Sequence, residues 1–229
     1  MSKNPQVSVI IVVKDGDRFL DSAIESVFQQ TFTNYELIVI DGNSTDNTAT
    51  IAKSYEQIRY FLQQSKGIAG AYNEGISNAK GELIAFLSHD DMWTPDKLET
   101  QVKYMEDNPE MEYTVARVKF FLETGHSAPS GFRSELLQGD HVGKIMETLV
   151  AKKTLFDKIG GLSSDFNVAE DVDWFARAND AKIPTGIVDR VLLNKRVHDT
   201  NLSLNAQENN QNLLTILRKS IERKRQQQK

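Results

Sequence analysis

Residues 7–13 read Val-Ser-Val-Ile-Ile-Val-Val, a β-branched run with a single small polar residue. A run that is apolar at nearly every position is typical of a strand buried on both faces, as in a parallel sheet. The turn-forming residues 14–17 follow, and apolar residues then recur at three- and four-residue spacing over residues 19–28. That spacing predicts an amphipathic helix. The stretch therefore predicts a strand–turn–helix unit, the first part of a βαβ unit.

The same alternation continues along the chain. Further strands are predicted at 35–40, 58–62, 83–87, 113–122, 145–151 and 188–197, and further helices at 46–54, 68–79, 95–107, 153–159, 170–180 and from 206 onward. Residues 123–140 are rich in Gly, Ser and Pro and are predicted to form a loop. Strands and helices at this spacing indicate an α/β protein with a Rossmann-like, mostly parallel central sheet flanked by helices. We expect one domain over residues 1–205 and a basic C-terminal helix or tail over 206–229.

The amino-acid composition excludes several classes of function for this chain. The chain has 229 residues, with 27 Lys+Arg against 32 Asp+Glu, a net charge of −5, and it has no cysteine. The absence of cysteine excludes disulfides, zinc–thiolate sites and cysteine nucleophiles. A mildly acidic chain is a poor candidate for nucleic-acid binding. The longest apolar run is too short to span a bilayer, and the first residues lack a signal-peptide pattern, so we expect a cytoplasmic protein.

Acidic residues follow several of the predicted strands. Asp15, Asp41, Asp90 and Asp91 all fall at carboxyl ends, where open sheets of this kind bind their ligands. Carboxylates suit Mg²⁺ or Mn²⁺, with a phosphate completing the coordination. An Asp-Asp pair is by itself more often a turn or a helix cap. Its place directly after the apolar run at 83–87 favours a functional role.

An ordered series of segments resembles family-2 glycosyltransferases over roughly residues 6–203. The matching segments are residues 7–11, 19–20, 23–27, 30–32, 36–46, 66–68, 73–76, 79–82, 86–91, 156–162, 170–173 and 196–198. The resemblance implies a GT-A fold and transfer of a sugar, with inversion, from a nucleotide diphosphate such as UDP. It also implies a glycan, lipid-linked or other hydroxyl acceptor, and a role in cell-envelope polysaccharide synthesis. Residues 1–110 would form a nucleotide-binding half and residues 111–205 an acceptor half.

The resemblance implies a metal site. Asp90 would bind Mn²⁺ or Mg²⁺ with Asp91 beside it, and His198 matches a position that in some relatives reaches the diphosphate or the metal. Relatives often have a carboxylate where this chain has Ser88, so the motif here is Ser-x-Asp-Asp. Two carboxylates still suffice for a cation that takes its other ligands from diphosphate and water. His198 is alternatively an ordinary loop residue.

The resemblance also implies a general base. Asp171, in the pair Glu170-Asp171, would take the proton from the acceptor hydroxyl as that hydroxyl attacks the anomeric carbon. Asp173 is the second choice, because a helix turns it to another face. The alternative for Asp171 is a carboxylate that the dipole favours at a helix N-terminus.

The remaining candidate residues would bind substrate. Asp41 would accept a hydrogen bond from the nucleotide base, or it simply forms an Asp-Gly turn. The other positions implied are Lys14, Asp15, Lys66, Gly67, Asn73, Trp93, Glu170 and Arg196. Trp93 would lie beneath a sugar or pack in the core, and Arg196 would bind phosphate or be a solvated strand residue. Relatives usually carry Pro-x-Tyr-Asn at residues 12–15, so the aromatic that stacks on the base is missing here, and Lys14 would contact phosphate or a base edge.

The tail has six basic residues against two acidic ones over residues 206–229. This composition predicts an amphipathic helix packed on the domain, or weak attachment to an anionic membrane surface at the inner face. Two other functions stay open. A nucleotidyltransferase would need a glycine-rich basic loop after the first strand, and residues 14–17 contain one Gly and two Asp. A sugar-nucleotide-binding protein that has lost catalysis is favoured by Ser88 and the missing aromatic, and disfavoured by Glu170-Asp171.

Overall fold

The computed structural model describes residues 4–123, 125–166, 168–199, 201 and 206–227. Its strands are β1 (Val7–Val13), β2 (Tyr35–Asp41), β3 (Ile58–Leu62), β4 (Leu83–Ser88), β5 (Met92–Trp93), β6 (Tyr113–Leu122), β7 (His141–Val142), β8 (Val150–Lys152) and β9 (Thr185–Val197). Its α-helices are α1 (Leu20–Phe28), α2 (Thr48–Ser54), α3 (Gly67–Asn78), α4 (Lys97–Asp107), α5 (Lys153–Ile159), α6 (Glu170–Asp180) and α7 (Ala206–Gln227). Short 3₁₀ helices span Ser134–Leu137 and Met146–Thr148.

One sheet runs through the molecule. Its strand order is β3-β2-β1-β4-β8-β6-β9-β5, with β7 paired to β6. β1 pairs in parallel with β2 and β4, and its register places Val13 beside Asp41 and Val12 beside Ser88. The carboxyl ends of these three strands therefore meet at one edge. β8 pairs antiparallel with both β4 and β6, so the second half of the chain extends the same sheet.

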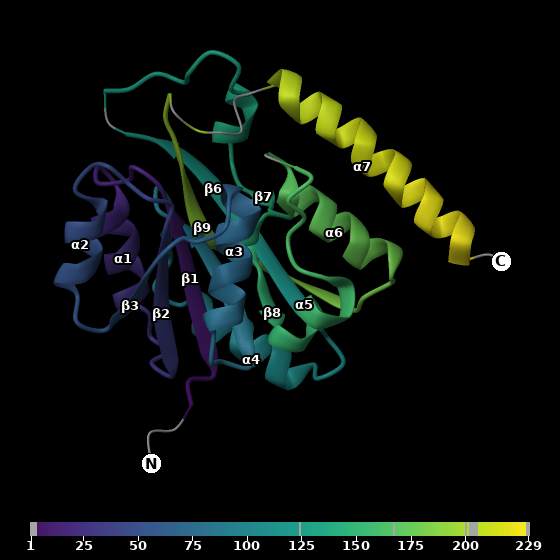
Figure 1. Ribbon diagram of the computed structural model, residues 1–229, viewed down its shortest axis with the longest axis horizontal. Helices are drawn as coiled ribbons and strands as arrows, with labels where there is room; N and C mark the ends of the chain where they lie inside the picture. The colour runs from purple at the N-terminus through teal and green to yellow at the C-terminus, as the bar shows by residue number, and fades with distance from the viewer. Residues whose placement is uncertain (1–3, 124, 167, 200, 202–205, 228–229) are drawn as a thin grey trace.

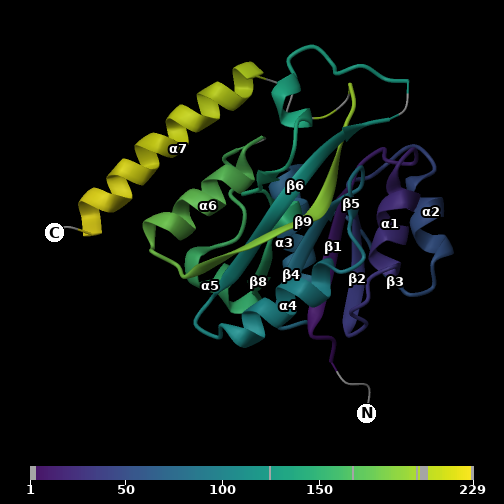
Figure 2. The same cartoon turned by 180° about the vertical axis from the view of Figure 1, so that it is seen from behind.

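Both faces of the sheet are covered. Even-numbered residues of β1, such as Ile10, pack in one core cluster with residues of α3, α5 and α6, while odd-numbered residues such as Ile11 pack with residues of α1, α2 and α4. Figure 1 shows α3 in front of the sheet, and Figure 2, from behind, shows α4. A strand buried on both faces needs apolar residues at every position, which is why β1 is a continuous β-branched run. The predicted α/β class and flanked parallel sheet are confirmed.

The predicted strand at 145–151 is wrong in its first part. Residues 146–148 form a 3₁₀ helix, and only Val150–Lys152 joins the sheet. The Thr148 hydroxyl donates to the carbonyl of Gly143 at 2.7 Å and contacts that of Ile145 at 3.0 Å. Such local side-chain bonds offer the backbone an alternative to a ladder. Glu147 lies on this turn, and its carboxylate contacts Ser88 at the end of β4.

The last helix, α7, lies along α6 on the outside of the molecule (Figure 1). Ile216 packs against Phe166 and Ala169, and Ser220 and Arg223 both bond Asp180. The predicted helix from residue 206 is thus confirmed, while Lys229 lies outside the described residues. Within the described ranges, no helix has the length and apolarity needed to cross a membrane.

Candidate functional site

The loops after β1 and β2 are bonded to each other. The backbone N–H of Asp15 donates to the Ser44 hydroxyl at 2.8 Å, and the Asp15 carboxylate accepts from the Thr45 N–H at 2.8 Å. The N–H of Gly16 donates to the Thr48 hydroxyl, also at 2.8 Å. The Asp15 side chain therefore connects the two loops, while the neighbouring Lys14 is exposed at the same edge.

Asp41 ends β2 with its carboxylate buried between two donors. Tyr60 donates its hydroxyl to Oδ2 at 2.6 Å, and the Ser44 N–H donates to Oδ1 at 2.8 Å. Burial and the Asp41 charge together raise the pKa of Tyr60, so its hydroxyl keeps its proton. The Asp41 carboxylate thus accepts two hydrogen bonds that fix its orientation, and its role toward a nucleotide base stays a prediction.

Asp90 lies after β4 and meets the chain that follows β9. Its Oδ2 lies 2.9 Å from His198 Nε2 and 3.1 Å from the Asn201 amide nitrogen. Burial alone would raise the pKa of Asp90, but the His198 hydrogen bond and the Lys195 charge outweigh it and hold that pKa well below its usual range. An ionised carboxylate and an imidazole therefore share one position, although they lie 108 residues apart.

Asp91 has a different environment from Asp90. Its carboxylate is 0% exposed; Oδ2 pairs with Lys195 Nζ at 2.7 Å, and Oδ1 accepts the Arg196 N–H at 2.9 Å. Both oxygens are therefore engaged within the protein. This geometry counts against the expectation that Asp91 is a metal ligand and indicates that it fixes β9 against the end of β4.

Glu147 is a site residue that the sequence analysis missed. Its carboxylate accepts a hydrogen bond from the Ser88 hydroxyl and lies 3.3 Å from Lys195 Nζ. The Glu147 carboxylate on the 3₁₀ helix is therefore bonded to Ser88, the position at which relatives often have a carboxylate. The signal in the sequence is Glu147 itself, the one charged residue within the predicted strand at 145–151.

Lys195 lies between the acidic groups. Burial alone would lower the pKa of Lys195, but the charges of Asp91 and Glu147 outweigh it and raise that pKa, so the ammonium stays charged. The Lys195 charge also acts on Asp90 and on Asp171. Lys195 therefore contacts one carboxylate after β4, that of Asp91, and one on the 3₁₀ helix, that of Glu147.

Glu170 and Asp171 begin α6. Burial, followed by the Glu147 charge, raises the pKa of Asp171 to about 6, and burial and the Asp171 charge raise the pKa of Glu170 to about 8. Asp173 is buried and pairs with Arg177 at 2.8 Å within the same helix. That ion pair leaves Asp171 as the better base candidate of the two.

Asn73 connects two elements, and its expected role in substrate binding stays a prediction. Its amide nitrogen donates to the Leu162 carbonyl at 2.8 Å, and its amide oxygen accepts the Leu162 N–H at 2.9 Å. A Cβ added to Gly161 would lie 2.3 Å from that oxygen, so the turn before α6 must approach α3 without a side chain. From the other side, Arg177 donates to the carbonyls of Ile159 and Gly161. The turn before α6 is therefore held by side chains of both α3 and α6.

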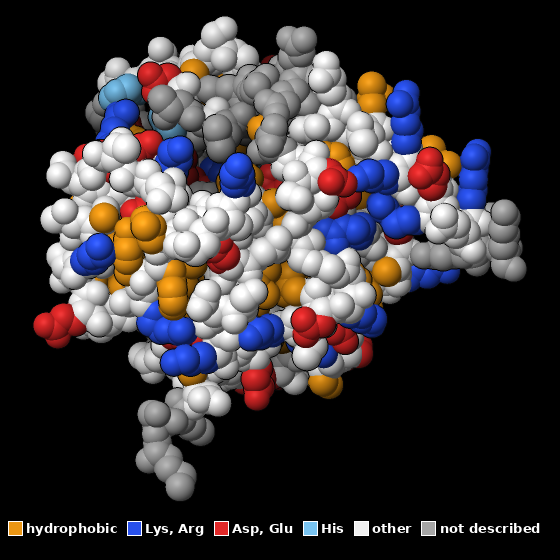
Figure 3. Space-filling view, viewed as in Figure 1, with side chains coloured by type: hydrophobic (Ala, Val, Ile, Leu, Met, Phe, Trp, Pro, Cys, Tyr) orange, Lys and Arg blue, Asp and Glu red, His pale blue; other side chains and the backbone are white. Residues whose placement is uncertain are grey.

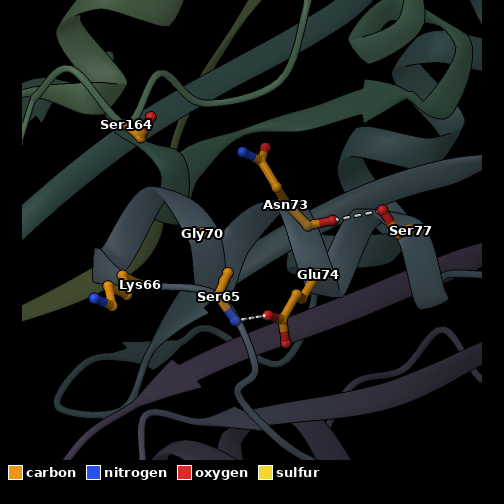
Figure 4. A pocket seen from close by; sticks show the side chains of 7 residues that line it. All are labelled: Ser65, Lys66, Gly70, Asn73, Glu74, Ser77 and Ser164. Atoms are coloured by element: carbon orange, nitrogen blue, oxygen red, sulfur yellow. Dashed lines mark hydrogen bonds between the residues drawn. The ribbon is translucent and has the colours of Figure 1, made fainter.

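A pocket of about 500 Å³ lies beside the start of α3. Figure 4 shows its lining residues, which are Ser65, Lys66, Gly70, Asn73, Glu74, Ser77 and Ser164. Glu74 accepts from the N–H groups of Gln64 and Ser65 and so fixes the loop before α3. Gly67 has a φ of 74°, a conformation that strains other residues. Lys66 lines the pocket and Gly67 follows it at the start of α3; the substrate-binding role of both residues stays a prediction.

Trp93 and Arg196 are both buried. Trp93 is 3% exposed, packs in the core and donates its indole N–H to the Glu147 carbonyl at 3.0 Å. Its burial favours core packing over a sugar-binding surface. The Arg196 guanidinium donates to the Asp90 carbonyl at 3.0 Å and pairs with Glu123 at 2.9 Å, so it is not a solvated strand residue.

The residues fit a divalent cation only in part. Asp90 and His198 supply an oxygen and a nitrogen of suitable chemistry at one point. In the portion of the chain that the structure describes, no group of three or more His, Asp or Glu side chains is arranged to hold a metal ion. A cation there would need its remaining ligands from a substrate and water.

Comparison with known proteins gives one consistent family. Residues 8–170 match the family model described as Glycosyl transferase family 2. An uncharacterised glycosyltransferase of Rickettsia typhi is 33% identical over 90% of this chain and 69% of its own length. The Escherichia coli enzyme WfgD, named UDP-Glc:alpha-D-GlcNAc-diphosphoundecaprenol beta-1,3-glucosyltransferase, is 38% identical over 44% of this chain and 42% of its own.

Solved structures share the fold. TarS 1–349 of S. aureus, in complex with UDP-GlcNAc, superposes with a TM-score of 0.71 at 18% identity, over 88% of this chain and 61% of that one. The Pyrobaculum calidifontis mannosyltransferase PcManGT, in complex with GDP-Man and Mn²⁺, superposes with a TM-score of 0.72 at 17% sequence identity. The superposition covers 96% of this chain and 65% of that one. The predicted GT-A fold is confirmed.

Proposed function

The chain belongs to glycosyl transferase family 2, and from that premise we propose that it transfers a sugar, with inversion, from a UDP-sugar to an acceptor hydroxyl. Family membership supports glycosyltransferase activity with a nucleotide-sugar donor. The observation that supports the finer proposal is the half-buried carboxylate of Asp171 in the first turn of α6, where the pair Glu170-Asp171 begins the helix and where the charges of Glu147 and Lys195 act on Asp171. In this proposal Asp171 and Asp90 belong to one site, because the Lys195 charge acts on both carboxylates.

Asp171 acts as the general base in this proposal. In a single displacement, the acceptor oxygen attacks the anomeric carbon from the face opposite the diphosphate, and Asp171 accepts the hydroxyl proton on a carboxylate oxygen. A pKa raised to about 6 suits this role, because the carboxylate is ionised at neutral pH yet basic enough to take a proton. Glu170 lies next to it as a protonated neighbour that can donate a hydrogen bond.

Asp90 and His198 are the residues that would hold Mn²⁺ or Mg²⁺. Such an ion neutralises charge on the departing diphosphate. The ion pair between Asp91 and Lys195 supports this arrangement. It fixes β9 to the end of β4, and His198 follows directly after β9. The Mn²⁺ complex of PcManGT supports the proposal by analogy of fold alone.

Asp41 would read the nucleotide. Its fixed carboxylate suits an imide N–H, the group that uracil presents. Lys14 would contact phosphate or the base edge, since no aromatic stands at residues 12–15. The acceptor would be a glycan or a lipid-linked sugar of a cell-envelope pathway, as the names of WfgD and of the Bacillus subtilis relative, a putative teichuronic acid biosynthesis glycosyltransferase, suggest.

Substitution of the base tests the proposal. Asp171→Asn keeps the shape but removes the proton acceptor, so transfer falls by at least about 100-fold while UDP-sugar binding by calorimetry stays unchanged. Asp165→Asn is the matched control, because Asp165 is exposed in the segment before α6 and pairs with Lys219. Full turnover in Asp171→Asn would remove Asp171 as the base.

A second candidate function is a sugar-nucleotide-binding protein without catalysis. The ion pair of Asp91 with Lys195 favours it, because it leaves Asp90 as the one carboxylate of the motif available to a cation. The same assay distinguishes the two: wild-type protein that binds UDP-sugars, with neither transfer to acceptors nor hydrolysis of the donor, supports the binding role.

A further inference from the structure

Four of the large exposed aliphatic side chains of the described residues lie on α7. Leu213 is 45% exposed, Leu214 59%, Leu217 56% and Ile221 43%. At about 100° per residue, positions 213, 217 and 221 follow one another along a helix face, and position 214 lies beside them. The outer face of α7 is therefore an apolar stripe about two turns long.

Basic residues border this stripe. Arg218 and Arg225 are exposed on one side of it, and Lys224 extends past its end, with one contact to Asp180 at 3.3 Å. Figure 3 shows blue and orange side chains next to each other where α7 forms the surface. Glu222 is the one acidic side chain among residues 211–226.

The opposite face of α7 is fixed to the domain. Ile216 is buried against Phe166, Lys219 pairs with Asp165 at 2.7 Å, and Arg223 pairs with Asp180 at 2.8 Å. The stripe therefore projects from a helix that already has its partner, and it is not the inward face of an undocked segment.

We propose that the outer face of α7 binds an anionic membrane surface. Aliphatic side chains flanked by Lys and Arg are the arrangement with which an interfacial helix enters the headgroup region, while the basic groups stay beside lipid phosphates. A second copy of the chain fits less well. Four partly exposed side chains fall short of the roughly 800 Å² per partner that a stable interface buries.

Vesicle sedimentation with the full chain tests this inference. The protein sediments with vesicles that contain phosphatidylglycerol, does so less at high salt, and binds pure phosphatidylcholine weakly. The double variant Leu214→Ser/Leu217→Ser binds at least about tenfold more weakly, because it loses the apolar area that enters the lipid. Ile187→Ser, an exposed aliphatic on β9, is the control and binds as the wild type does.

Three outcomes would overturn the inference: no binding to anionic vesicles, equal binding by the double variant, or a dimer in sedimentation equilibrium that the same two substitutions abolish. The last would assign the stripe to a second copy. The inference stands apart from the proposed function, because transfer to a water-soluble acceptor without lipid is expected to be equal in the double variant and the wild type.

Discussion

Asp171 owes its chemistry to its neighbours. Burial is the main cause of its raised pKa, and the Glu147 carboxylate adds to it. As the proposed base, Asp171 is active only when ionised, so we expect kcat to rise with pH up to about 6 and to level off above it. Glu147→Gln removes one negative charge and should move the midpoint to lower pH. A midpoint that is the same in both proteins would show that another group controls the profile.

Asp90 offers a second test at the scale of one residue. Asp90→Ala removes the carboxylate proposed to hold the cation beside His198, so UDP binding should lose its dependence on Mn²⁺, with an affinity loss of about tenfold or more. Titration calorimetry with and without Mn²⁺ measures this change. Asp107→Ala, at an exposed position on α4, is the control and should leave both titrations as they are. If Asp90→Ala bound UDP with the same Mn²⁺-dependent affinity as the wild type, Asp90 would not be a ligand of the cation.

Among the elements, the turn between α5 and α6 leads to Asp171, the proposed base. Asn73 on α3 holds this turn through two bonds to Leu162. Asn73→Ala should cost about 1–3 kcal/mol of unfolding free energy, since both partner groups of Leu162 lose their bonds. It should also lower kcat more than the affinity for UDP-sugar, because α6 shifts while the ends of β1 and β2 stay in place.

Asn78→Ala serves as the control for this prediction. Asn78 lies on the same helix, but its amide bonds only the Glu74 carbonyl one turn earlier. Its loss should leave kcat near the wild-type value. A kcat for Asn73→Ala as high as that of Asn78→Ala would show that the two Asn73–Leu162 hydrogen bonds do not position the proposed base.

Elements of regular period were predictable, and irregular ones were not. The runs at β1 and β2 satisfy one constraint, burial on both faces, so a short window of sequence suffices. The 3₁₀ turn at 146–148 depends on Thr148 reaching back to two carbonyls, and its apolar neighbours resemble a strand. Glu147 was missed for this reason, since the side chain of a residue in a strand has a different direction from that of a residue on a 3₁₀ turn. Only the turn brings the Glu147 carboxylate to Ser88.

At the scale of the whole molecule, α7 stabilises the domain with one face and leaves the other exposed. Ile216→Ala should lower the unfolding free energy by about 2–4 kcal/mol, because a 4% exposed side chain is removed from its contacts with Phe166 and Ala169. Leu217→Ala, one residue further along and 56% exposed, should change it by about 0.5 kcal/mol or less. Denaturant unfolding measures both, and equal losses would mean that α7 packs differently.

Local sequence determined the α/β class, the order of the main elements and the acidic residues at the strand ends, because burial and helix periodicity act over a few neighbouring residues. The tertiary structure decided which acids have partners. It paired Asp91 with Lys195 and Asp90 with His198, more than a hundred residues away, and brought Glu147 to Ser88. Charge pairing depends on distances in space, which a spacing along the chain does not encode.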